Sequence, residues 1–173
     1  PYFTIGFIVW NWFSTTLIDT STCLVEVEGV IKQLKIPLTT HLLRVSVRNG
    51  IVFLHNSILI LVVIFLFKLD VMLTDFFIIT IPGIFLIFLS MNSIGIMLAL
   101  VSLRYRDVSN LIFFVLQVLF FLTPVLWHPD LLDKKQILVE FNPFFYWVDI
   151  IRQPILGLEI HRNSLLFLTI SSF

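Results

Sequence analysis

The stretch FFIITIPGIFLIFLSMNSIGIMLALVSL, residues 76–103, contains no Lys, Arg, Asp or Glu. A helix needs about 20 apolar residues to cross a bilayer, because it rises about 1.5 Å per residue through roughly 30 Å of hydrocarbon. This stretch is longer than that, so we expect it to tilt or to kink, with Pro82-Gly83 as the natural kink site. Gly95 and Ala99, four residues apart, would let a neighbouring helix approach closely. The stretch therefore predicts a membrane-spanning helix.

The composition of the whole chain agrees with this reading. Hydrophobic residues make up 58% of the 173 residues and charged residues 13%, against roughly 25% charged in ordinary soluble domains. The net charge is zero, and no basic patch indicates a nucleic-acid partner. Cys23 is the single cysteine, so an intramolecular disulfide is excluded. The sequence indicates an integral membrane protein.

Three further stretches approach the length of a span. Residues 1–18 and 108–127 carry no charge, residues 49–67 carry no Lys, Arg, Asp or Glu, and the first helix would continue to about Val25. Residues 163–173 would form the first half of another span. The expected fold is all-α and polytopic, with four full spans and a partial fifth in one transmembrane domain, residues 1–173. Since the chain starts at Pro1 and ends inside an apolar run, we expect a fragment of a longer protein.

Residues 137–157 are apolar but differ from the spans. They carry three charges, each of which costs about 2.5–3.5 kcal/mol at the centre of a membrane helix. Asn142-Pro143 favours a turn. We expect two short helices that enter the membrane on the outer side and return, with the break at Asn142-Pro143. The alternative is a helical hairpin that lies on the membrane interface.

Basic residues in short loops predict the orientation. Residues 26–48 hold Lys32, Lys35, Arg44 and Arg48, and residues 104–107 hold two arginines. Both segments are therefore expected to face the cytoplasm. Residues 68–75 and 128–162 would then lie outside.

Two stretches have patterns that could serve a function. Residues 24–35 show a helical apolar stripe, with Glu28 and Lys32 in the favourable i, i+4 order. They predict a short amphipathic helix that either rests on the lipid or docks a soluble partner. Residues 108–127 carry aromatic residues and Gln117 on one face, which either packs against a neighbouring helix or stacks on sugars. No Walker A motif, nucleophile motif or metal-binding spacing is present in the sequence, so we expect neither catalysis nor a bound cofactor or metal.

An ordered set of motifs resembles a known family. In chain order these are WNWF (10–13), LKIP (34–37), LRYRDV (103–108), Gln117, FLTPVLW (121–127), FNPFF (141–145) and RQPILG (152–157). The set is similar to that of the permeases of ATP-binding-cassette exporters that move polysaccharides, namely O-antigen, capsule and teichoic acid exporters. Such permeases have six spans after an amphipathic interface helix. The resemblance implies that this fragment begins at the second span and stops within the sixth.

The resemblance also implies roles for particular residues. A coupling helix that docks on the ATPase subunit would include Glu26, Glu28, Ile31, Lys32 and Lys35. The translocation path would include Phe113, Phe114, Gln117, Phe120 and Phe121. The outer gate would include Asn142, Pro143, Arg152, Pro154 and Gly157, and the cytoplasmic entrance would include Arg104, Arg106 and Asp107.

The implied assembly contains two permease copies and two ATPase subunits in the cytoplasmic (inner) membrane. ATP and Mg²⁺ would be bound by the ATPase subunits, and a lipid-linked glycan would pass between the permeases. A related permease for drugs, ions or lipids is the nearest alternative. A membrane-embedded glycosyltransferase or acyltransferase is another, but it should show a cluster of ionisable residues at one membrane face, and the charges here are scattered.

Overall fold

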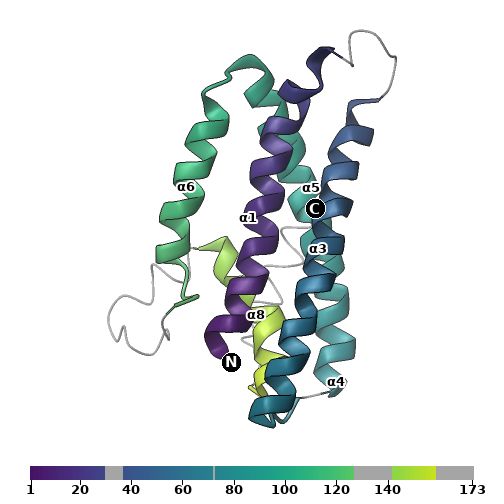
Figure 1. The fold of residues 1–173 in the computed structure, drawn as a ribbon, viewed down its shortest axis with the longest axis vertical. Helices are drawn as coiled ribbons and strands as arrows, with labels where there is room; N and C mark the ends of the chain where they lie inside the picture. Colours follow the sequence, from purple (N-terminus) through teal and green to yellow (C-terminus); the bar gives the residue numbers. More distant parts are fainter. Residues whose placement is uncertain (30–36, 72, 127–141, 159–173) are drawn as a thin grey trace.

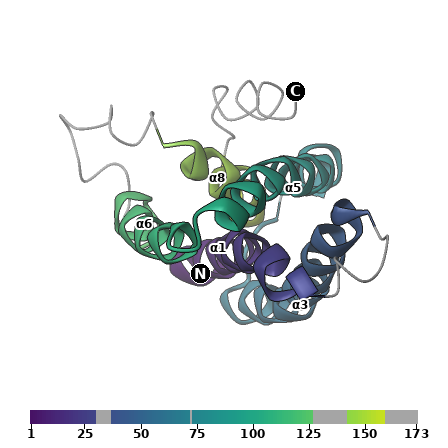
Figure 2. The same ribbon diagram turned by 90° about the horizontal axis from the view of Figure 1, so that it is seen from above.

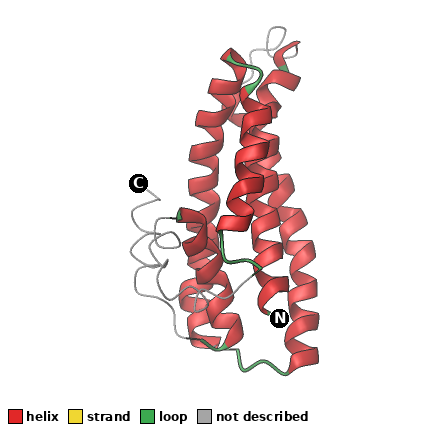
Figure 3. Ribbon diagram, turned by 90° about the vertical axis from the view of Figure 1, so that its left-hand side faces the viewer, coloured by secondary structure: helices red, strands yellow, loops and turns green. Residues whose placement is uncertain are grey.

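A computed structural model describes residues 1–29, 37–71, 73–126 and 142–158, and every described element is helical (Figures 1 and 3). The expected all-α class is confirmed for these residues. The elements in chain order are α1 (Tyr2–Glu26), α3 (Leu38–Phe67), α4 (Leu73–Asp75), the π-helix η1 (Phe76–Thr80), α5 (Ile81–Arg104), α6 (Val108–Leu122) and α8 (Pro143–Leu156).

Helix α1 lies at the centre of the bundle and packs against α3, α5, α6 and α8 (Figure 2). Its buried side chains include Ile5, Val9 and Phe13, which form the main hydrophobic core with residues of α5 and α8. Its buried threonines donate to carbonyls of their own helix, as Thr16 does to Trp12 O at 2.7 Å. This bonding satisfies the hydroxyls inside the apolar core.

The predicted close approach at Gly95 is confirmed. A Cβ atom at Gly95 would lie 2.8 Å from Thr20 Oγ1 of α1, so only glycine allows α1 and α5 this separation. Ala99 is fully buried in a second small core near Leu24 and Leu42. Small residues on α5 therefore set the α1–α5 spacing.

The irregularity in the long apolar stretch lies just before the predicted kink site. The π-helix η1 covers Phe76–Thr80, and α5 begins at Ile81 with Pro82 in its first turn. Proline has no N–H to donate to the preceding turn, and a π turn is one way in which a helix accommodates a locally broken hydrogen-bond ladder.

Two helix boundaries differ from the expected ones. Helix α3 begins at Leu38 rather than near Asn49, so Arg44 and Arg48 are helical and do not belong to a loop. Helix α6 ends at Leu122, before the expected end at Trp127. Thr123 is extended, with ψ 133°, because a residue before proline is disfavoured in the helical conformation.

Two of the described helices are long and apolar enough to cross a membrane, namely α3 with 30 residues and the continuous η1–α5 segment with 29. Much of the α3 surface is exposed apolar side chain, including Leu54, Leu61 and Phe65, as expected of a helix that faces lipid. Helix α6 is a shorter apolar helix of 15 residues. The expected number of spans stays a prediction, and residues 163–173 lie outside the described part of the chain.

The helices alternate in direction, so the connections gather at two ends (Figure 1). The end of α1, the start of α3 and the α5–α6 connection lie together at the top of the view. The start of α1, the end of α3 and helix α8 lie at the bottom. The described parts of the segments predicted as cytoplasmic thus share one end of the bundle, and residues 68–71 and α8, predicted as outer, share the other. Which side of the membrane each end faces stays a prediction.

Candidate functional site

A groove of about 260 Å³ lies between α1 and α6. Five residues of α1 and four of α6 line it: Phe7, Trp10, Asn11, Ser14, Ile18, Phe113, Leu116, Gln117 and Phe120. Its walls therefore combine aromatic faces with two carboxamides and a hydroxyl. Such a lining can contact the apolar face of a ligand and bond to hydroxyl groups at the same time.

Trp10 is the centre of the aromatic contacts in this groove. Its ring centroid lies 5.5 Å from that of Phe120 across the groove. It also lies 4.6 Å from Phe13 and 5.9 Å from Phe144 of α8, both in edge-to-face geometry. Edge-to-face contacts of this kind stabilise aromatic clusters beyond their buried area. Trp10 thus connects the groove directly to the start of α8.

The five residues predicted for the translocation path divide into two groups. Phe113, Gln117 and Phe120 line the groove. Phe114 and Phe121 are not among its lining residues and are 60% and 61% exposed. Adjacent positions on a helix point about 100° apart, so the broad aromatic face of the sequence becomes two separate faces.

The α1 side of the groove was not identified from the sequence. Phe7, Trp10, Asn11, Ser14 and Ile18 recur at spacings of three and four residues, so they share one helical face. Polar and aromatic residues on one face of an otherwise apolar helix were the available signal.

The start of α8 agrees with the break predicted at Asn142-Pro143. Asn142 Oδ1 accepts a hydrogen bond from the Phe144 N–H at 3.0 Å, which caps the helix, and Pro143 occupies the first helical position, as is typical of helix starts. Asn142 Nδ2 donates to Thr123 Oγ1 at 2.8 Å. The other helix of the predicted re-entrant pair falls on residues 137–141, outside the described residues.

Arg152 is buried between α8, α1 and the turn that follows α6. Only 2% of its side chain is exposed, and it lies 3.6 Å from Asp149 Oδ1. Arg152 Nη1 donates to Pro124 O at 2.9 Å, and the guanidinium lies 3.8 Å from the centroid of the Tyr2 ring. Gln153 Nε2 donates to Asp149 Oδ1 at 2.7 Å. Arg152 was predicted from the sequence but its partners were not, although the helical spacing brings Arg152 and Gln153 close to Asp149.

The remaining predicted gate residues shape the second half of α8. Pro154 lies inside the helix, where it has no N–H for the Ile150 carbonyl. Thr80 Oγ1 donates to that carbonyl at 3.3 Å. Gly157 ends the helix with φ +68°, and a Cβ there would lie 2.6 Å from Asp70 O. Glycine is required at this position both by its conformation and by the close approach.

At the opposite end of the bundle, Arg106 Nη2 donates to Glu28 Oε2 at 3.1 Å, and both side chains are well exposed. The Arg104 guanidinium lies 5.7 Å from the centroid of the Tyr105 ring. Asp107 occupies the N-cap position of α6, where its side chain makes no capping hydrogen bond within the described residues. The Arg106–Glu28 ion pair therefore joins the predicted cytoplasmic entrance to the predicted coupling helix.

The predicted coupling helix is described only in part. Glu26 is the last residue of α1, and Glu28 follows two residues later. Ile31, Lys32 and Lys35 lie within residues 30–36, outside the described residues.

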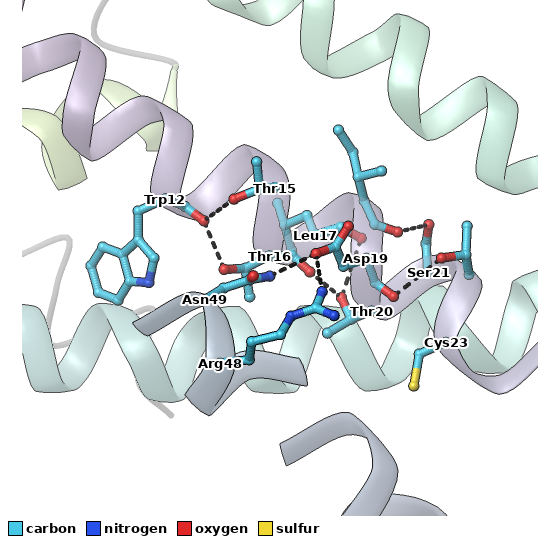
Figure 4. Close-up of polar contacts among 12 residues, drawn as sticks. Trp12, Thr15, Thr16, Leu17, Asp19, Thr20, Ser21, Cys23, Arg48 and Asn49 are labelled. Atoms are coloured by element: carbon cyan, nitrogen blue, oxygen red, sulfur yellow. Dashed lines mark hydrogen bonds and ion pairs between the residues drawn. The ribbon is translucent and has the colours of Figure 1, made fainter. Parts of the chain in front are cut away.

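Polar contacts of Asp19 join α1 to α3 (Figure 4). Asp19 Oδ2 accepts from Arg48 Nη2 at 2.6 Å and from Asn49 Nδ2 at 3.0 Å. Asn49 is buried, whereas the Arg48 side chain is 63% exposed. This contact explains how Arg48 is accommodated on a helix. In the part of the chain that the structure describes, no group of three or more His, Cys, Asp or Glu could hold a metal ion.

Comparison with protein families gives one match. The family described as ABC-2 type transporter matches residues 1–156. Comparison with curated proteins finds no similar sequence.

Proposed function

The chain belongs to the ABC-2 type transporter family and is a membrane component of an ABC transporter, and we propose that it exports a lipid-linked polysaccharide of the O-antigen, capsular or teichoic acid type across the cytoplasmic membrane. Membership of the family implies an ATPase partner. In the proposal, that partner binds ATP and Mg²⁺ and hydrolyses the ATP. A second copy of this chain completes the membrane part, and the glycan passes between the two copies.

The α1–α6 groove is the observation that carries this proposal. Sugar rings present apolar C–H faces together with hydroxyl groups. The groove offers Phe113 and Phe120 for the faces, with the buried Trp10 packed against Phe120, and it offers Asn11 and Gln117 for the hydroxyl groups. A polar carboxamide on a membrane helix is costly unless it finds a partner, and a hydroxylated ligand is such a partner. A purely apolar substrate would offer these amides no hydrogen-bond partner.

In this mechanism, one end of the bundle would receive the motion of the ATPase subunits, and the opposite end would open to release the glycan. ATP-driven closure of the ATPase subunits would press on the segment that begins at Glu28, which Arg106 connects to the start of α6. The helices would then shift as rigid bodies. At the other end α8 contacts α1, η1 and α5 and would act as the outer gate.

Substrate-stimulated ATP hydrolysis in proteoliposomes tests the substrate class. The complex of permease and ATPase partner is expected to hydrolyse ATP faster with lipid-linked glycan than with the lipid carrier alone. Phe113→Ala should reduce this stimulation, while Phe114→Ala, which removes the same side chain from the neighbouring face, should not. Stimulation by drugs or by glycan-free lipid, and none by lipid-linked glycan, would contradict the proposal and favour the alternative permease class.

Docking of the ATPase subunit is tested by reversing charges on the coupling segment. Glu28→Arg combined with Lys32→Glu should weaken recovery of the ATPase in a pull-down while membrane insertion stays intact. Glu28→Arg combined with Arg106→Glu is the control for the loss of the Glu28–Arg106 pair, because it restores that pair in reverse. Unchanged recovery in the first variant would remove the docking role, and equal loss in both would assign the effect to Glu28 alone.

A further inference from the structure

The start of α5 and the middle of α8 are joined by a hydrogen bond between a side chain and a backbone carbonyl. Thr80, the last residue of η1, is fully buried, and its Oγ1 donates to Ile150 O at 3.3 Å. Inside a helix this carbonyl would accept from the N–H four residues later, but residue 154 is proline and has none. Thr80 therefore supplies the donor that Pro154 lacks.

Several Ser and Thr hydroxyls in the described helices bond within their own helix, whereas the Tyr2 hydroxyl of α1, like that of Thr80, bonds to another segment and donates to Pro124 O at 3.3 Å. Thr16, Thr20 and Ser57 each donate to the carbonyl four residues earlier, at 2.7, 2.7 and 2.8 Å. This is the ordinary behaviour of Ser and Thr in helices. Thr80 departs from it, since it lies at the end of a π turn and bonds to a different helix. Short π segments within helices are frequent at functional sites.

Helix α8 is held more firmly on its other side. Asn142 Nδ2 donates to Thr123 Oγ1 at 2.8 Å, and Arg152 Nη1 donates to Pro124 O at 2.9 Å. The second of these has a charged donor, and such bonds are roughly twice as strong as neutral ones. The Thr80 bond is neutral and long for a hydroxyl donor. Of these three bonds of α8, the one to η1 is the weakest.

From this asymmetry we propose that α8 and the turn after α6, residues 123–125, move as one rigid body during transport. The Thr80–Ile150 hydrogen bond is then the contact that breaks when this body separates from α5. The inference rests on the proposed function only in taking α8 as the moving gate. Thr80 is then a positioning residue that sets how readily the gate parts from α5. A hydrogen bond of this kind inside a membrane bundle shifts a two-state equilibrium by about threefold.

Two spin-label distances in the whole complex test whether α8 separates from α5 during transport. The complex of permease and ATPase partner is placed in lipid nanodiscs, with Cys23→Ser as background. One pair of labels joins Phe85→Cys on α5 to Leu158→Cys after α8, and the other joins Leu122→Cys at the end of α6 to Leu158→Cys; all three native side chains are exposed. With ATP trapped, the 85–158 distance should lengthen and the 122–158 distance should stay constant. A change in the 122–158 distance, or none in the 85–158 distance, would overturn the inference.

Substitutions at Thr80 test its own role. Without nucleotide, Thr80→Val, which keeps the shape and removes the hydroxyl, should increase the long-distance fraction of the 85–158 pair about threefold. Thr80→Ser keeps the donor and should match the unsubstituted protein, as should Ser57→Ala, which removes a hydroxyl bonded within α3. Equal distance distributions in the Val and Ser variants would remove the role of the hydroxyl. No glycan is present in these measurements, so they can fail or succeed independently of the glycan-stimulation assay.

Discussion

Replacing Arg152 with methionine would remove the cation that lies 3.6 Å from the buried carboxylate of Asp149. The two side chains are 2% and 1% exposed, and removing one partner of a buried ion pair typically costs about 3–5 kcal/mol. The substitution also removes the hydrogen bond to Pro124 O and the contact with the Tyr2 ring, each worth on the order of 1 kcal/mol. Gln153 still donates to Asp149 at 2.7 Å and offsets part of the loss.

We expect a net loss of about 4 kcal/mol from these terms. In a chain of this size that corresponds to a fall of roughly 10 °C in the midpoint of thermal unfolding. Tryptophan fluorescence in detergent is a suitable assay, because Trp147 lies buried in α8. Arg106→Met is the matched control: the Arg106 side chain is 74% exposed, so its loss should cost under about 1 kcal/mol.

The double variant Arg152→Met with Asp149→Leu separates the charge effect from the loss of contacts. It removes both buried charges, and such replacements are often neutral or stabilising. We expect it to recover most of the stability that Arg152→Met loses. A midpoint for Arg152→Met within about 2 °C of the unsubstituted protein, or a double variant less stable than the single one, would refute the reasoning.

Three further predictions concern the packing of the bundle. Gly95→Ala should cost about 1–3 kcal/mol through overpacking, because its Cβ would lie 2.8 Å from Thr20 Oγ1; adding Thr20→Ala should restore the thermal midpoint, and an unchanged midpoint in Gly95→Ala would contradict the close α1–α5 contact. Gly157→Ala should lower the midpoint by more than the ordinary left-handed strain of about 1–2 kcal/mol, because the new Cβ also meets a backbone carbonyl; calorimetry checks this, and a neutral result would refute it. Asp19→Ala should destabilise more than Arg48→Ala in denaturant titrations, because the carboxylate accepts from a buried asparagine as well as from the exposed arginine; equal effects would contradict that arrangement.

The sequence predicted the helices well where one physical rule decides the outcome. Charge-free runs gave the positions of α3, α5 and α6, since water and lipid separate apolar from charged segments whatever the tertiary fold. The first helix, expected to reach about Val25, ends at Glu26. Asn142-Pro143 marked the start of α8, because capping and the geometry of proline are local properties.

The sequence did not predict the features that depend on contacts between distant segments of the chain. Helix α3 extends to Leu38, and charge counting assigned its first residues to a loop because the pairing of Arg48 with Asp19 is not visible in a local pattern. The aromatic face of α6 was read as one surface because its neighbour was unknown. Only the position of α1 shows that Phe113 and Phe120 face the groove and that Phe114 does not. The bond from Thr80 to Ile150 joins residues 70 positions apart, and it too has no local signal.

Photo-crosslinking during transport tests most directly whether the glycan passes along the α1–α6 groove. A photoreactive phenylalanine analogue is placed at Phe120, which lines the groove, or at Phe121, which is 61% exposed and does not. Radiolabelled lipid-linked glycan is then supplied to the working complex with ATP. We predict ATP-dependent labelling of the permease from position 120 and background labelling from position 121. Equal labelling from both positions, or labelling from position 121 alone, would contradict the proposed path.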